Sequence, residues 1–207
     1  MKRLIIGISG ASGVIYGIRM LEVLQELGDV ETHLIVSKFG RLNIDIETSH
    51  SIDYVEDLAD VVHGLGNQAA AISSGSFRTD GMVIAPCSMN TLSAIAHSAA
   101  GNLLVRAADV VLKERRPLVL MPREVPLHVG HCKLLYEVAQ LGAVIAPPMP
   151  AFYNQPATID DLINHSVGRV LDLFGIDTGA VKRWEGPLKS TCADPIPANV
   201  SDMKEHK

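Results

Sequence analysis

Short apolar runs alternate along this chain with segments whose apolar residues recur at helical spacing. The runs are bounded by glycine, proline or small polar residues, which is typical of buried strands. The predicted strands span residues 4–9, 32–36, 82–85, 118–121 and 143–146. The predicted helices span residues 14–27, 39–47, 54–63, 91–97, 103–114, 134–141 and 159–174. Strands that alternate with helices predict an α/β fold with a parallel sheet covered on both faces.

Residues beside two of the predicted helices support their limits. Gly28 and Gly175 each follow a helical pattern, where glycine commonly ends a helix. Thr158 is a suitable N-cap for the last helix, with Asp160 and Asp161 in its first turn.

Polar side chains gather where the predicted strands end. They occur at residues 10–13, 37, 87–91, 123–124 and 151–153. The carboxyl ends of parallel strands meet at one edge of a sheet, and ligands of such folds bind beyond that edge. The sequence therefore predicts one rim of polar residues that holds a ligand.

Composition and charge narrow the class of protein. Apolar residues make up 47% of the chain and aromatic residues only 4%, so we expect a core of Leu, Ile, Val and Ala. The formal net charge of −5 argues against a general nucleic-acid binder. No apolar stretch reaches the length of a membrane span, and Gly7, Ser9 and Gly10 interrupt the N-terminal run too early for a signal peptide. We expect a cytoplasmic protein.

The chain divides by composition into a domain of residues 1–186 and a tail of residues 187–207. The tail holds three prolines and several small polar residues and has no apolar periodicity, so we expect it to be flexible.

Glycines at positions 7, 10 and 13 form a G-x-x-G-x-x-G pattern between a predicted strand and a predicted helix. This pattern differs from the G-x-G-x-x-G dinucleotide fingerprint. Two interpretations stay open. The loop holds a phosphate at the helix N-terminus, or it is a tight turn with a serine as N-cap.

A second strand-to-helix junction lies at residues 86–91, PCSMNT. Ser88 and Thr91 are suited either to cap the following helix or to donate hydrogen bonds to a ligand. Cys87 follows an apolar strand, so we interpret it as a buried thiol rather than a nucleophile.

Charged residues occur in two places near predicted strands. Residues 113–116, KERR, end a helix, where basic side chains favour the helix dipole. Arg123 and Glu124 come directly after a buried strand, where ligands bind. Arginine can hold a phosphate through two parallel hydrogen bonds, and a partly desolvated Glu124 would be a candidate acid or base.

Three further features are weaker. His128 and His131 would share a helix face, but no third ligand at a suitable spacing accompanies them, so we predict no metal site. Tyr153 lies in a proline-rich, stiff segment that is able to position a phenol. Arg169 lies on the last predicted helix, where a solvated side chain is the simpler interpretation.

Taken together, the motifs resemble the UbiX-type flavin prenyltransferase family over about residues 2–184. The resemblance rests on an ordered series of segments rather than on one motif. These are GISGASG at 7–13, ETHLIVSK at 31–38, ISSGSF at 72–77, PCS at 86–88, RAADVVLKERRPLVL at 106–120, PRE at 122–124 and PAFY at 150–153.

The resemblance implies a Rossmann-like, flavodoxin-type three-layer sandwich that binds reduced FMN as a substrate. It implies transfer of a prenyl group from dimethylallyl phosphate to N5 and C6 of the flavin, without a metal. The product would serve a UbiD-type decarboxylase, and the protein would assemble as a dodecamer with sites shared between subunits. Basic residues would then stabilise the departing phosphate.

Site residues follow from the resemblance by position. Those implied to contact FMN are Gly10, Ala11, Ser12, Ser37, Ser88, Met89, Asn90, Thr91 and Arg123. Those implied to hold dimethylallyl phosphate are Lys113, Arg123, Tyr153, Arg169 and Trp184, whose aromatic face would favour an allylic cation. Those implied to take part in catalysis are Ser12, near the flavin N5, Lys113, Glu47 and Glu124, with proton handling as the role of Glu124.

The sequence departs from the family at Asn90, where many relatives have lysine, and in its longer C-terminal tail. Two other functions are weighed beside the prenyltransferase. One is an FMN-dependent decarboxylase of the phosphopantothenoylcysteine type, but His50 and the PCSMNT segment do not match that pattern. The other is a flavin-binding, non-catalytic subunit of a hydroxyarylic acid decarboxylase. The sequence leaves open whether the donor is the monophosphate or the pyrophosphate.

Overall fold

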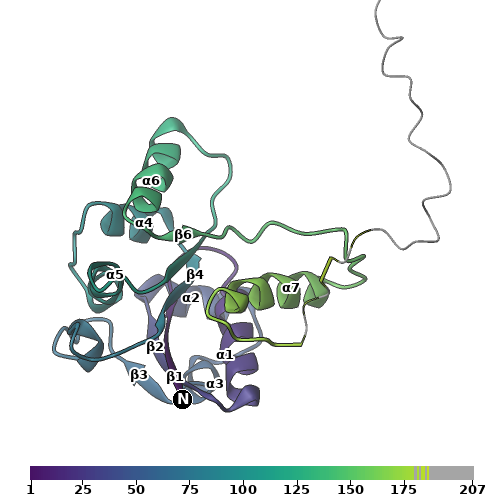
Figure 1. The fold of residues 1–207 in the computed structure, drawn as a ribbon, viewed down its shortest axis with the longest axis horizontal. Coiled ribbons are helices and arrows are strands. Elements are labelled where there is room, and N and C mark those ends of the chain that lie inside the picture. Colours follow the sequence, from purple (N-terminus) through teal and green to yellow (C-terminus); the bar gives the residue numbers. More distant parts are fainter. Residues whose placement is uncertain (180, 182, 185, 187–207) are drawn as a thin grey trace, which may run out of the picture.

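A six-stranded parallel sheet forms the centre of the molecule, in the order β3-β2-β1-β4-β5-β6 (Figure 1). The computed structural model describes residues 1–179, 181, 183, 184 and 186, so the predicted tail at residues 187–207 lies outside the described residues. The strands are β1 (Lys2–Ile8), β2 (Val30–Val36), β3 (Val61–His63), β4 (Gly81–Cys87), β5 (Leu118–Pro122) and β6 (Val144–Ile145).

Helices cover both faces of the sheet and make a three-layer sandwich. One face carries α1 (Ile15–Leu27), α2 (Lys38–Glu47), α3 (Ile52–Asp57) and α7 (Ile159–Asp172). The other carries α4 (Met89–Ala96), α5 (Leu103–Lys113), α6 (Val129–Gln140) and the short 3₁₀ helix η1 (Ala71–Ser73). In Figure 1, α7 lies beside α1, although the two helices are separated by most of the chain.

The strands have unbroken apolar sequences because both faces of the sheet are buried. Successive side chains of β1 point to opposite faces, so Leu4, Ile6 and Ile8 join one hydrophobic cluster while Ile5 joins the other. All four side chains are at most 1% exposed. A strand that is buried on both faces has no solvent-facing positions for polar residues.

The predicted α/β fold and all five predicted strands are confirmed. The predicted helix at residues 54–63 is partly wrong, because only Ile52–Asp57 is helical and Val61–His63 is an additional edge strand. This strand pairs with β2, with His33 opposite Val61 and Ile35 opposite His63. Three residues carry too little pattern to reveal a strand, and their pairing partner is distant in the sequence.

The predicted helix limits also agree with the structure. Gly28 is the left-handed C-cap of α1, and the side chain of Thr158 caps α7 in a full capping box with Asp161. None of the helices in the described part of the chain has the length and apolar character needed to cross a membrane.

The strand order creates a topological switch point at the carboxyl edge of the sheet. β1 and β4 are neighbours, yet α1 leaves β1 toward one face and α4 leaves β4 toward the other. The loops that follow β1 and β4 therefore diverge, and α/β proteins bind ligands at such a switch point.

Candidate functional site

The loop after β1 is tied directly to the end of β4. The buried hydroxyl of Ser9 donates to the carbonyl of Pro86 at 2.8 Å and accepts from the backbone N–H of Ser88 at 2.7 Å. These bonds fix the two sides of the switch point relative to each other. In the sequence, Ser9 stands out only as an interruption of an apolar run, and its local pattern carries no signal of this function.

The start of α1 is held by a carboxylate from α2. Glu47 accepts from the backbone N–H of Gly13 at 2.8 Å and of Val14 at 3.4 Å, and Asn43 donates to the carbonyl of Ala11 at 3.0 Å. Glu47 and Asn43 are four residues apart on α2, so their side chains share a helix face. Of the two interpretations of this loop, the serine N-cap is wrong, because α1 has Val14 at its N-cap position and no capping side chain of its own.

Asn43 was not predicted as a site residue. The signal that would have found it is its spacing from Glu47 on a helix that begins at the predicted rim. That signal becomes specific only when the position of the loop 10–13 beside α2 is known.

Three helix N-termini meet at this edge of the sheet. α1, α2 and α4 follow the adjacent strands β1, β2 and β4. Ser37 caps α2 by accepting from Gly40 N–H at 3.0 Å, and Ser88 caps α4 by accepting from Thr91 N–H at 3.2 Å. Each N-terminus carries partial positive charge, so together they favour an anion.

The loop itself offers hydrogen-bond donors. Within the described residues, the backbone N–H groups of Gly10 and Ser12 have no hydrogen-bond acceptor. A Cβ at Gly10 would lie 2.3 Å from the Cβ of Phe39 at the start of α2, so only glycine fits there. The close approach brings the loop against the N-terminus of α2 and suits a site that holds a phosphate group.

Arg123 joins this loop from β5. Its Nε donates to the carbonyl of Ser12 at 3.4 Å, and its backbone N–H donates to the carbonyl of Cys87 at 3.3 Å. Arg123 therefore lies at the predicted rim, beside Ser12. Glu124 is exposed, and its carboxylate accepts from the N–H of Val125, so a single chain does not supply the desolvation that an acid or base needs.

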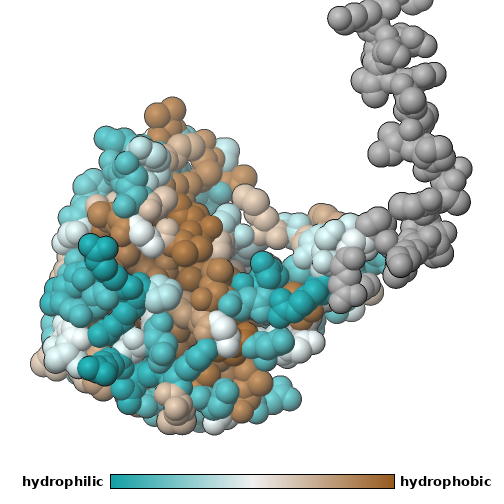
Figure 2. Space-filling model, in the orientation of Figure 1, coloured by the Kyte–Doolittle hydropathy of each residue, from teal (hydrophilic) through white to brown (hydrophobic). Residues whose placement is uncertain are grey.

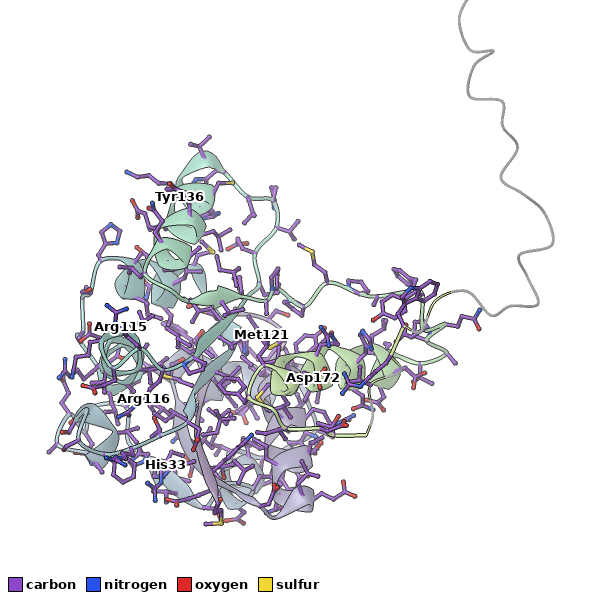
Figure 3. The ribbon with its side chains drawn as sticks, in the orientation of Figure 1. His33, Arg115, Arg116, Met121, Tyr136 and Asp172 are labelled. Atoms are coloured by element: carbon purple, nitrogen blue, oxygen red, sulfur yellow. The ribbon has the colours of Figure 1, made fainter. Side chains whose placement is uncertain are left out.

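A second group of residues surrounds a cavity of about 250 Å³ between the end of β5 and α7. Met121, Met149 and Leu173 give it apolar walls, and Arg169 and His165 contribute polar groups. Arg169 is held by Asp172 at 2.7 Å. Figure 3 shows Met121 and Asp172 on neighbouring parts of the molecule. The cavity combines an apolar space with a guanidinium group.

Tyr153 and Trp184 lie next to this cavity. The hydroxyl of Tyr153 is 3.1 Å from Nε2 of His165, and the rings of Tyr153 and Trp184 meet edge to face at 6.0 Å. Tyr153 is 49% exposed, so its ring is open to a ligand. His165 was not predicted as a site residue, because it belongs to no motif in the sequence.

Lys113 lies away from both groups. It ends α5, which leads into the start of β5, so it is at the amino edge of the sheet, whereas Arg123 follows the carboxyl end of the same strand. Lys113 pairs with Glu114 beside the turn that contains Gly75. Figure 3 shows Arg115 and Arg116, which follow it, across the sheet from Asp172. Within one chain, Lys113 and Arg123 therefore lie at opposite edges of the sheet, so the implied site that contains both would have to be shared between subunits.

The remaining predicted residues of α4 lie in two different environments. Thr91 is buried and accepts a hydrogen bond from the Ser88 hydroxyl at 3.1 Å. Met89 and Asn90 instead line a cavity of about 510 Å³ between α4 and α6.

His128 and His131 also line the cavity between α4 and α6, and their rings are 3.6 Å apart. Their predicted closeness is confirmed. Among the described residues, no group of three or more His, Cys, Asp or Glu is arranged to hold a metal ion. His128 accepts from Gly130 N–H at the start of α6, which gives it a capping function.

Cys87 is fully buried and free, in agreement with the interpretation as an inert thiol. Burial in apolar surroundings raises the pKa of its thiol far above the ordinary value, because the thiolate would lose its hydration.

Two histidines make the stability of the fold depend on pH. Burial, then the nearby His33, lowers the pKa of His63 below its ordinary value of 6.5. Burial, then the charge of Arg169, lowers the pKa of His165, partly offset by Asp172. Below pH 6.5 the unfolded chain therefore binds more protons than the folded one, so the free energy of unfolding should fall as the pH drops from 7 to 5.

Urea unfolding at pH 7.5, 6.5 and 5.5 measures this dependence at fixed protein concentration. Replacing His165→Gln should make the decrease smaller, since the glutamine does not titrate. An unchanged decrease in that variant would show that His165 does not contribute to it.

A family model and known proteins with similar sequences match most of this chain. The family model described as Flavoprotein matches residues 1–169. "Flavin prenyltransferase UbiX" of Escherichia coli strain K12 is 57% identical over 188 residues, which cover 90% of this chain and 100% of that protein. The protein of the same name from Thauera aromatica is 55% identical over 89% of this chain and 94% of its own length.

Solved structures agree with the sequence relatives. A structure of AnUbiX (PadA1) in complex with FMN and dimethylallyl pyrophosphate has a TM-score of 0.88 and 49% identity, covering 90% of this chain and 99% of that one. A dodecameric FMN-dependent UbiX-like decarboxylase from Escherichia coli O157:H7 has a TM-score of 0.87 and 50% identity, covering 89% of this chain and 100% of that one.

More distant structures share the fold alone. A PPC decarboxylase mutant is 21% identical, with a TM-score of 0.57 over 72% of this chain and 83% of that one. This identity is too low to transfer the alternative decarboxylase activity to this chain.

Proposed function

This chain belongs to the UbiX flavin prenyltransferase family, and from that premise we propose how it carries out its reaction. It joins the dimethylallyl group of dimethylallyl phosphate to N5 and C6 of reduced FMN. One observation carries the proposal: three helix N-termini and a glycine loop converge beside Arg123, and the apolar cavity with Arg169 lies at the other side of β5.

The loop 10–13 is the proposed binding site for the FMN phosphate and for part of the flavin. The unpaired N–H groups of Gly10 and Ser12, together with the N-termini of α2 and α4, offer donors and partial positive charge to an anion. Ala11, Ser37 and the segment 88–91 complete the proposed contacts. The residues present fit FMN because the donors lie on both sides of the switch point.

The cavity beside α7 is the proposed site of the prenyl donor. Met121 and Met149 suit an apolar dimethylallyl chain, and Arg169 suits the phosphate as a charged hydrogen-bond donor. Tyr153 would bind the same phosphate, and Trp184 would close the cavity beside Tyr153. A structure of a 49% identical relative that contains dimethylallyl pyrophosphate supports a donor of this class.

Positive charge at the donor site is the main contribution of the protein to the chemistry. Breaking the bond between carbon and phosphate oxygen leaves negative charge on the phosphate. Arg123 and Arg169 would stabilise that charge as it develops, without a proton or a metal. FMN supplies the nucleophilic N5 and C6 positions when it is bound in its reduced form.

Lys113 enters the site in this proposal only from another subunit. Its position at the amino edge of the sheet keeps it from the rim of its own chain. A 50% identical relative is dodecameric, which supports an assembly of this kind. Figure 2 shows a band of hydrophobic surface that runs from α6 past β6 toward α7. Near the ends of these three elements, Leu141, Val144, Met149 and Leu173 are exposed and suit contacts between subunits.

The acidic residues have separate proposed functions. Glu47 holds the loop that carries Ser12, since its carboxylate accepts from two backbone N–H groups of that loop. Ser12 would then lie at a fixed position near the flavin N5. Glu124 would handle a proton after a neighbouring subunit has covered it and excluded water. The product would pass to a UbiD-type decarboxylase.

The decisive experiment is a single incubation followed by mass spectrometry of the released flavin. Purified protein is mixed without oxygen with reduced FMN and dimethylallyl phosphate, and in parallel with the pyrophosphate. We expect a flavin heavier by one prenyl unit. Glu124→Gln should form it at least 10-fold more slowly, because a positioned proton-transfer group contributes about 10²–10⁴-fold.

Glu26→Gln is the matched control, since Glu26 is an exposed residue of α1 far from the rim. It should retain the rate of the unchanged protein. Unmodified FMN from the unchanged protein with both donors, despite bound flavin, would refute the prenyl transfer.

A further inference from the structure

His165 is a buried histidine on α7 that the proposed reaction has not used so far. Only 6% of it is exposed, and it lines the cavity beside α7 together with Arg169. Its Nε2 lies 3.1 Å from the hydroxyl of Tyr153, 12 residues earlier in the chain. The two rings meet edge to face, with centroids 5.5 Å apart and an angle of 81°.

The charge state of His165 follows from its surroundings. Burial and the nearby Arg169 lower its pKa, and Asp172 opposes this effect only in part. The imidazole is therefore neutral at pH 7, with one nitrogen that donates and one that accepts. Tyr153 is its hydrogen-bond partner at Nε2.

The other ring nitrogen decides which of the two carries the hydrogen. Nδ1 of His165 is buried and has no hydrogen-bond partner among the described residues. A hydrogen on Nδ1 would be a buried donor without an acceptor, and orphaned N–H groups are rarer in proteins than under-used acceptors. The hydrogen is thus assigned to Nε2, which donates to the oxygen of Tyr153.

This assignment determines what Tyr153 offers to a ligand. Its oxygen accepts from His165, so its own hydroxyl hydrogen remains free to donate. Tyr153 is half-exposed, and Arg169 lines the same cavity as His165, so both donors are available to one anion.

We infer that His165 is a positioning residue that orients Tyr153 as a hydrogen-bond donor to the phosphate of the prenyl donor. The inference rests on the proposed function, in which Tyr153 and Arg169 bind that phosphate. In this arrangement His165 acts on the phosphate through Tyr153. It acts by holding the phenol and by keeping its hydroxyl hydrogen directed away from α7.

Two substitutions separate positioning from packing. His165→Leu removes the hydrogen bond and keeps a similar volume, whereas His165→Gln retains an N–H donor. We expect His165→Leu to raise KM for dimethylallyl phosphate about 5–10-fold at saturating reduced FMN, the cost of one hydrogen bond, with a smaller change in kcat. His165→Gln should return KM to within about twofold of the unchanged protein.

A double-substitution cycle tests whether the effect passes through Tyr153. In a Tyr153→Phe background there is no hydroxyl to orient, so His165→Leu should cause no further loss. An unchanged KM in His165→Leu, no rescue by His165→Gln, or additive losses in the double variant would each overturn the inference.

A binding measurement keeps the test independent of turnover. Titration of the FMN-loaded protein with inorganic phosphate should give a higher Kd, and so a lower affinity, in His165→Leu than in His165→Gln. Equal phosphate affinities in the two variants would overturn the inference. A protein that forms no prenylated flavin but shows this difference in affinity would contradict the proposed reaction and leave the positioning intact.

Discussion

Oligomers that mix Lys113→Ala and Arg123→Ala subunits should regain activity that neither variant has alone. Each single variant should lose about 10- to 100-fold in rate, because each removes a charged contact to the departing phosphate, worth about 1.5–3 kcal/mol. If Lys113 serves the site of a neighbouring subunit, some sites in a mixed oligomer contain both intact residues. Random mixing at equal amounts would repair about one quarter of the sites.

The expected recovery follows from the position of Lys113 in the fold. It lies at the amino edge of the sheet and Arg123 at the carboxyl edge, so one chain cannot bring both to the same phosphate. Co-expression of two differently tagged variants, followed by purification through both tags, gives the mixed oligomer. The rate of prenylated flavin formation is then measured by mass spectrometry.

Arg115→Ala is the matched control for Lys113→Ala, since Arg115 is a basic, exposed neighbour at the same helix end. It should leave the rate unchanged. Mixed oligomers that are as inactive as the single variants would contradict a shared site and would return Lys113 to a structural function at the end of α5.

Gly17→Ala should destabilise the protein by about 1–2 kcal/mol, although alanine is usually the better helix former. A Cβ at position 17 would lie 2.3 Å from the carbonyl oxygen of Ala85 and 2.8 Å from Cγ1 of Ile8. α1 would have to move away from β1 and β4. Overpacking of this kind costs about 1–3 kcal/mol or more and outweighs the gain of about 1 kcal/mol in helix propensity.

Urea unfolding at fixed protein concentration measures this change. Because the shift would displace the start of α1, FMN affinity should fall as well, and fluorescence titration detects that loss. Gly64→Ala is the control, since no atom of the described residues lies within 4 Å of a Cβ at position 64. A Gly17→Ala variant as stable as the unchanged protein would show that α1 can move over the sheet at little cost.

Much of the site was predictable because, in an α/β fold, residues that directly follow parallel strands lie together at the carboxyl edge of the sheet. Ser37, Ser88 and Arg123 were expected at the rim from their places after strands, and the structure has them there. The same rule was available for Lys113. A helix that leads into a strand ends at the amino edge of the sheet. The separation of Lys113 from Arg123 therefore followed from the order of helices and strands along the chain.

Other features depend on contacts between segments that are distant in the sequence. The edge strand β3 has three residues, and only its pairing with β2 distinguishes it from the end of a helix. Glu47 is the acceptor at the start of α1 because α2 passes beside that loop. Neither arrangement leaves a pattern in the local sequence.

The sequence by itself determined the alternation of strands and helices, the two-sided burial of the sheet and the family. Apolar periodicity and strand order are local or sequential properties, and they are sufficient for these conclusions. Only the tertiary structure decided that His165 meets Tyr153 and that Glu47 holds the loop 10–13. Hydrogen bonds need two groups within about 3 Å of each other, and that closeness is set by packing of whole elements rather than by residue type.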